Sequence, residues 1–163
     1  MLARMLTSRL PQTLAALSAA AAALLVSATA ASAAPTPTAH IVGPVFTHDG
    51  GTTATVTASY RCFQPTHLWV SAKQMNSGSR DPALELEGSS AYADSYLQQH
   101  PTTLNCDGRL HVQAFTVDKT EVVPWSPDPV GKGALGRGWA WVQFCMTTED
   151  GGLTYPTRWA RVL

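Results

Sequence analysis

The sequence is poor in charged residues and has no run of basic ones. Of its 163 residues, 11 are Lys or Arg and 11 are Asp or Glu, and the basic residues are scattered along the chain. Nucleic acids and anionic membranes favour proteins with clustered Lys and Arg. We therefore expect no nucleic-acid partner.

The sequence also lacks the local patterns that accompany the common catalytic and metal sites. It has no Gly-x-Ser-x-Gly motif, and its five histidines form no H-x-H or H-x-x-x-H pair. Glu85 and Glu87 fit one side of a strand as paired carboxylates, but a solvated strand face explains them equally well. We predict no catalytic residue, no metal site and no cofactor. A secreted hydrolase stays as the less favoured alternative.

The first 33 residues have the layout of a secretory signal peptide. Arg4 and Arg9 precede an alanine- and leucine-rich stretch, and Ala31-Ser32-Ala33 forms an A-x-A cleavage site. The apolar stretch is shorter than the roughly 20 residues that span a bilayer, and no apolar tail ends the sequence. We predict a signal peptide over 1–33, one domain over 34–163, and a secreted protein with no stable membrane anchor.

Beyond the signal segment, the sequence alternates apolar and polar residues in short runs separated by turn residues, which predicts strands. The expected strands cover 39–48, 52–62, 66–74, 83–88 and 109–118, followed by a hairpin over 137–163 that turns at 149–152. Residues 89–100 fit a short helix or a strand. Pro44 favours an edge position for the first strand, because proline cannot donate to a ladder. About seven short strands with almost no helical periodicity predict an antiparallel β-sandwich or barrel.

The three cysteines leave one unpaired if a disulfide forms after export. Alternation turns Cys62 inward with Val56 and Tyr60, whereas Cys145 points outward from its strand. Cys106 lies in the turn "NCDGR" and is free to approach Cys62. We favour a Cys62–Cys106 disulfide. A Cys62–Cys145 bridge, as in antibody domains, is the rival pairing.

Three pieces of the sequence carry a resemblance to a known group of proteins. The strand "TVTASYRC", the turn "CDGRLH" and the late hairpin "GWAWVQFCMTTEDGG" are similar to those of small exported actinobacterial proteins of unknown function with a predicted immunoglobulin-like domain. The resemblance implies the sandwich fold and supports the Cys62–Cys106 pairing. It implies no activity, and Cys145 departs from the group's usual pattern.

Aromatic residues gather on the polar side of three expected strands. If the small apolar residues face the core, one outer sheet face carries Trp69, Trp139, Trp141, Tyr155 and Trp159. An exposed aromatic patch of this size is typical of a surface that binds a protein or a sugar. The alternative is that segment 76–100 or the proline-rich connection around 122–130 folds across the sheet and buries these rings.

Together these observations predict a secreted, non-enzymatic binding module for an extracellular protein or glycan. A structural protein associated with the cell envelope is the alternative.

Overall fold

Strands dominate the computed structural model, which describes residues 36–86, 89–99, 104–122 and 127–163. The strands are β1 (Thr38–His48), β2 (Thr53–Arg61), β3 (Pro65–Gln74), β4 (Ala93–Gln99), β5 (His111–Asp118), β6 (Gly138–Thr148), β7 (Leu153–Thr154) and β8 (Thr157–Val162). Two short 3-10 turns are η1 (Asp49–Gly51) and η2 (Pro82–Glu85). The all-β class is confirmed, and the predicted signal peptide lies outside the described residues.

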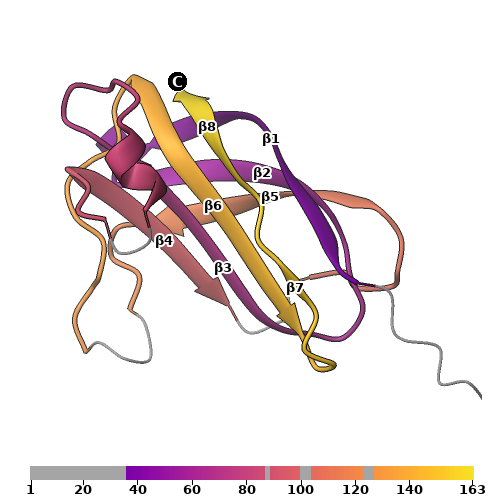
Figure 1. The fold of residues 1–163 in the computed structure, drawn as a ribbon. Coiled ribbons are helices and arrows are strands. Elements are labelled where there is room, and N and C mark those ends of the chain that lie inside the picture. The colour runs from indigo at the N-terminus through magenta and orange to yellow at the C-terminus, as the bar shows by residue number, and fades with distance from the viewer. Residues whose placement is uncertain (1–35, 87–88, 100–103, 123–126) are drawn as a thin grey trace, which may run out of the picture. The chain divides into compact units, whose positions relative to one another are not determined.

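The sheet closes on itself (Figure 1). Its strand order is β3-β4-β5-β2-β1-β8-β6, and β6 pairs in turn with β3, while the short β7 lies beside β6. All of these pairs are antiparallel except β1 with β8, which is parallel. The prediction of a purely antiparallel sandwich is therefore wrong in this respect. The sheet is a mixed, seven-stranded barrel.

A bend in β1 produces the parallel pair. The register of β1 on β2 shifts between Val42 and Phe46, at the Gly43–Pro44 step, and Val45 then pairs with Val162. Gly43 has a φ of +68°, a conformation that glycine adopts without steric cost. The expected edge position of β1 is wrong, because β1 has a partner strand on both sides. Pro44 lies at the break in the β1–β2 register, so its missing N–H breaks no regular ladder.

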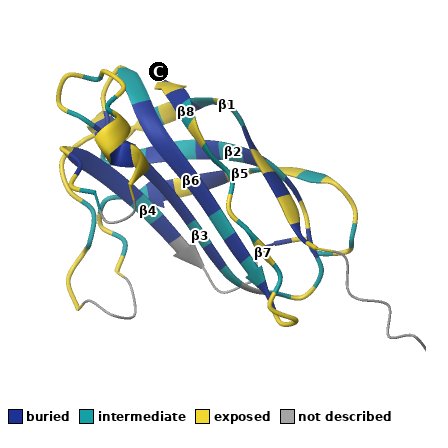
Figure 2. Ribbon diagram, in the orientation of Figure 1, coloured by how far each residue is buried: buried dark blue, intermediate teal, exposed yellow. Residues whose placement is uncertain are grey.

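Two narrow seams close the barrel. β4 meets β5 through the single pair Tyr96–Asp118, and β1 meets β8 through the single pair Val45–Val162. The longer ladders lie within two layers, β1–β2–β5 and β4–β3–β6–β8. Between the layers lies the main core, whose largest fully buried side chains are Tyr60, Phe144, Leu68, Met146, Val45, Val56, Val70, Val117, Val142 and Val162. Figure 2 shows the resulting alternation of buried and more exposed residues along the strands.

The cysteine pairing predicted from strand alternation is confirmed. Cys62 and Cys106 form a disulfide across 44 residues of sequence, with their Cα atoms 4.7 Å apart. Cys145 lies outside this disulfide and stands opposite Trp69 in the β3–β6 ladder. The rival Cys62–Cys145 bridge is wrong, because Cys62 is fully buried and Cys145 stands on the other face of its strand.

The segment between β3 and β4 differs from the expected short strand. Pro82–Glu85 forms η2 because Asp81 accepts a hydrogen bond from the Ala83 N–H at 2.9 Å and Pro82 pre-sets the first helical position. Of the ambiguous segment 89–100, residues Ala93–Gln99 form a strand, β4. Glu87, one of the two candidate paired carboxylates, lies outside the described residues.

Candidate binding face

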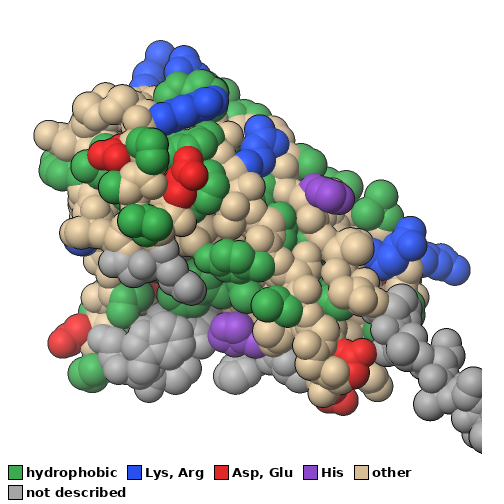
Figure 3. Space-filling model, in the orientation of Figure 1, with side chains coloured by type: hydrophobic (Ala, Val, Ile, Leu, Met, Phe, Trp, Pro, Cys, Tyr) green, Lys and Arg blue, Asp and Glu red, His purple; other side chains and the backbone are tan. Residues whose placement is uncertain are grey.

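The five aromatic residues singled out from the sequence stand on the outer side of the β4–β3–β6–β8 layer. In the ladders, Trp69 is opposite Cys145, Trp141 is opposite Trp159, and Trp139 is opposite Arg161. Their sequence neighbours Leu68, Val70, Ala140, Val142 and Ala160 are fully buried in the core beneath. Figure 3 shows hydrophobic side chains gathered on this face, over η2 and the strands behind it. The face has three parts, which differ in how far other segments of the chain cover them.

The middle part is covered by the segment between β3 and β4. Trp141 is only 9% exposed and packs with Leu84 of η2 and with Ala91, and Trp159 packs against the same cluster. The Trp159 indole N–H donates to Glu85 Oε1 at 2.7 Å. The expectation that Trp141 offers an exposed ring is wrong. The alternative, in which segment 76–100 folds across the sheet, is confirmed for this ring. Leu84 of η2 covers the Trp141 ring, which would otherwise face water.

The second part, toward the start of β3 and the end of β6, remains accessible to solvent. Trp69 is half-buried and contacts Tyr96, with ring centroids 4.9 Å apart, while Tyr155 is 43% exposed. Ser71 donates to Gln143 Oε1 at 3.0 Å, and the Gln143 amide donates to the Tyr155 hydroxyl. We call Trp69, Tyr96 and Tyr155 the aromatic row. It combines flat rings with a chain of polar groups that runs beneath them.

The row is anchored at Tyr96. The Tyr96 hydroxyl donates to Asp94 Oδ2 at 3.0 Å, and the Lys132 N–H donates to Asp94 Oδ1 at 2.7 Å. Burial of the phenol and, after it, the neighbouring Asp94 charge raise the pKa of Tyr96 well above its usual value. Tyr96 is therefore a neutral hydrogen-bond donor across the physiological pH range.

The third part, at the start of β6, holds Trp139 among arginines. The guanidinium carbon of Arg80 lies 3.6 Å from the centre of the Trp139 ring, and that of Arg161 lies 5.1 Å from it. Trp139 is half-buried, whereas both arginines are exposed.

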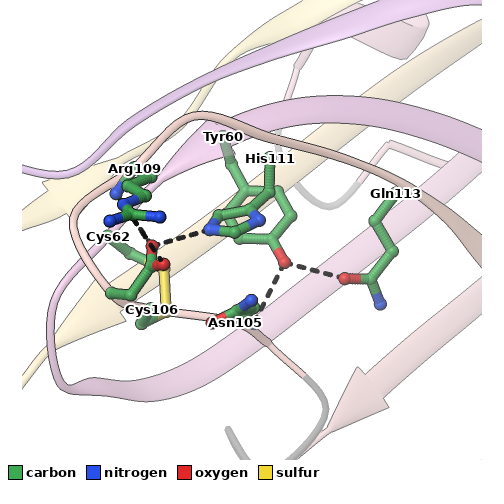
Figure 4. Close-up of a disulfide and its surroundings, with 8 residues drawn as sticks. Tyr60, Cys62, Asn105, Cys106, Arg109, His111 and Gln113 are labelled. Atoms are coloured by element: carbon green, nitrogen blue, oxygen red, sulfur yellow. Dashed lines mark hydrogen bonds and ion pairs between the residues drawn. A yellow bond between two sulfur atoms is a disulfide. The ribbon is translucent and has the colours of Figure 1, made fainter.

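The "CDGRLH" turn gathers polar groups beside the disulfide (Figure 4). Asp107 Oδ1 is 2.7 Å from His111 Nε2 and accepts from the Arg109 N–H at 2.9 Å, and these hydrogen bonds lower the pKa of Asp107. The Tyr60 hydroxyl donates to Gln113 Oε1 at 2.7 Å and accepts from the Asn105 N–H at 3.2 Å.

An Asp–His pair also orients the base in hydrolytic sites, but a nucleophile must then bond to the other side of the imidazole. Among the described residues, no hydroxyl or thiol bonds to His111, whose ring contacts Tyr60 instead. The pair fixes the turn that presents Cys106 to Cys62.

No group of three His, Cys, Asp or Glu side chains within the described residues is arranged to hold a metal ion. No helix among them has the length and apolar character needed to cross a bilayer. Comparison of the sequence with protein-family models and with curated proteins finds no match.

Sequence reasoning missed two contributors to this face. Tyr96 completes the aromatic row, and Arg80 packs on Trp139. Alternation along 93–99 as a strand separates Tyr96 from the inward Ser95 and Leu97, but the β3–β4 register is needed to bring its ring against Trp69. No local signal places Arg80, because a loop brings it back onto the sheet.

Proposed function

We propose that this protein is an exported, non-enzymatic binding module that holds an extracellular glycan or protein on its aromatic row. One observation carries the proposal: Trp69, Tyr96 and the 43% exposed Tyr155 share one sheet face, over the Ser71–Gln143–Tyr155 hydrogen bonds. Aromatic side chains give a large contact area with few rotamers to freeze, and their flat faces suit the apolar faces of sugars.

Export is supported by two independent features. The N-terminal 33 residues have signal-peptide layout. The Cys62–Cys106 disulfide is of a kind that forms and persists in oxidising compartments, and it is rare in the cytosol.

The strand connections support an immunoglobulin-like relationship, in line with the resemblance to exported actinobacterial proteins. The layers β1–β2–β5 and β4–β3–β6–β8 are joined mainly by single-residue seams, so each keeps the character of a separate sheet. A first strand that pairs with the second strand along its length and with the last strand at Val45–Val162 links such sheets without changing their order. On this proposal, the closed barrel is a sandwich whose two edges touch.

The test uses the mature protein on a glycan array and in a pull-down from culture supernatant. We expect Trp69→Ala and Tyr155→Ala each to weaken binding about tenfold or more, as removal of an aromatic anchor does. Phe46→Ala is the matched control, because Phe46 is a 47% exposed aromatic residue on β1, in the other layer. Thermal unfolding of each variant checks that the fold is kept.

Equal binding by Trp69→Ala and Phe46→Ala would contradict the proposal. A protein that binds no ligand and stays in the cell-envelope fraction would favour the structural alternative.

A further inference from the structure

Two arginines from different segments converge on one tryptophan at the start of β6. The guanidinium carbon of Arg80 lies 3.6 Å from the centre of the Trp139 ring, and that of Arg161 lies 5.1 Å from it. The two guanidinium carbons are therefore less than about 9 Å apart. Two positive charges this close repel each other, and the ring quadrupole offsets only part of that repulsion.

A backbone contact lies directly before Arg80 in the sequence. The Trp139 N–H donates to the Gly78 carbonyl at 2.8 Å, and a Cβ at Gly138 would collide with the Gly78 backbone. The turn before Arg80 therefore rests directly on the start of β6. Arg161 is brought to the same ring by the β6–β8 ladder, in which it stands opposite Trp139.

The nearest acidic residues in the sequence are engaged elsewhere. Asp81 accepts from the Ala83 N–H at 2.9 Å, and Glu85 accepts from the Trp159 indole at 2.7 Å. Within the part of the chain that the structure describes, no carboxylate forms an ion pair with Arg80 or Arg161.

A guanidinium packed on a ring keeps its in-plane N–H donors at the rim. These donors form a fork that matches the oxygens of sulfate, phosphate or carboxylate. Exposed arginines without an acidic partner are common, and Arg61 on the other layer is one of them. The convergence of two such groups on a fixed ring distinguishes this cluster.

We propose that Arg80, Trp139 and Arg161 form an oxyanion-binding site, which takes a sulfate, phosphate or carboxylate group between the two guanidiniums. The group is supplied either as a free anion or as a substituent of an extracellular polysaccharide. This site is separate from the aromatic row, because η2 and Trp141 lie between them on the sheet face.

The test is an NMR titration of the mature protein with sodium sulfate, at ionic strength held constant with chloride. We expect saturable shifts of the Trp139 indole N–H and of the Arg80 and Arg161 Nε–H signals. Arg80→Gln and Arg161→Gln should each weaken binding about tenfold, the usual effect of one charge-assisted hydrogen bond. Arg61→Gln is the matched control and should leave the affinity unchanged.

A second arm compares dextran sulfate with unsulfated dextran. Tighter binding of dextran sulfate than of inorganic sulfate, lost in the Arg80→Gln/Arg161→Gln double variant, supports the polysaccharide source. Equal affinity for dextran sulfate and for inorganic sulfate supports a free anion as the ligand. The absence of saturable shifts, or unchanged affinity in the double variant, would overturn the site. Trp69→Ala changes no residue of this cluster. If the aromatic row proves not to bind a ligand, the sulfate titration therefore still tests the oxyanion site.

Discussion

Gly108 is the residue on which the disulfide turn depends most directly. Its φ is +80°, and a Cβ at this position would collide with the ring of Phe63. Its N–H donates to the Cys62 carbonyl at 3.1 Å, so the turn lies against the residue that forms the disulfide. Both the backbone conformation and the contact therefore require glycine.

We predict that Gly108→Ala lowers the free energy of unfolding by about 3 kcal/mol, combining the cost of a left-handed alanine with overpacking against Phe63. Gly151→Ala is the control, because Gly151 has a φ of +81° with open space around it. The control should lose only about 1 kcal/mol. Urea unfolding measures both values, and equal losses would contradict the role given to Phe63.

Asp107 links the turn to pH. Hydrogen bonds from His111 and from the Arg109 N–H lower the pKa of Asp107 below its ordinary 3.8. A carboxyl with a lowered folded-state pKa stabilises the fold above its unfolded-state pKa, and this contribution is lost as the pH falls through the folded value.

We therefore predict that Asp107→Asn is less stable than the wild type at pH 7 and that the difference is smaller at pH 2, where more of the Asp107 carboxyl is protonated. Urea unfolding at the two pH values measures it. A difference of the same size at both pH values would show that Asp107 acts by shape alone.

At the scale of elements, η2 decides how much of the aromatic face is open. Leu84 is fully buried on Trp141, although it comes from a segment of only four residues. The sequence around it, capped by Asp81 and begun by Pro82, favours a turn over a strand. The turn places the Leu84 side chain on the outer face of the sheet, against Trp141.

We predict that Leu84→Ala lowers the free energy of unfolding by about 3 kcal/mol and shifts tryptophan emission to longer wavelength as water reaches Trp141. Leu86→Ala is the control, since Leu86 is 68% exposed, and it should change stability by less than about 0.5 kcal/mol. Equilibrium unfolding followed by fluorescence gives both readouts. An unshifted emission maximum in Leu84→Ala would contradict the covering role of η2.

At the scale of the whole molecule, the barrel is closed by its last residues. Val162 is buried and pairs with Val45, the Leu163 N–H donates to the Val45 carbonyl at 2.9 Å, and the Thr47 N–H donates to the Leu163 carbonyl at 3.1 Å. These contacts make up the β1–β8 seam.

We predict that deletion of Val162 and Leu163 lowers the free energy of unfolding by about 3 kcal/mol or more. The deletion removes one buried valine, the two backbone hydrogen bonds to β1, the hydrogen bond from the Thr47 hydroxyl to the Leu163 carbonyl, and the Gly138–Val162 pair with β6. Leu163→Ala keeps the backbone and removes a side chain that is 54% exposed, so it should cost less than about 1 kcal/mol. Urea unfolding measures stability, and hydrogen exchange of the Thr47 amide reports on the seam. Unchanged protection of Thr47 after the deletion would contradict this account.

Alternation along the strands was enough to predict which side chains enter the core and which cysteine meets Cys62. Leu68, Val142 and Ala160 are buried as expected, and Cys106 pairs with Cys62. This success has a local cause, because side chains on a strand alternate between its two faces whatever the strand pairs with.

From the sequence alone, most of the strands could be predicted, together with their inward and outward sides and five of the aromatic residues that share a face. The fold as a whole sets the break in β1 at Gly43–Pro44, where β8 becomes a second partner, the cover of Trp141 by η2, and the return of Arg80 onto Trp139. Each of these depends on which segments distant in sequence come together, and no local pattern of residues specifies that. The face predicted as one aromatic surface is thus three different surfaces, because a single turn lies across its middle.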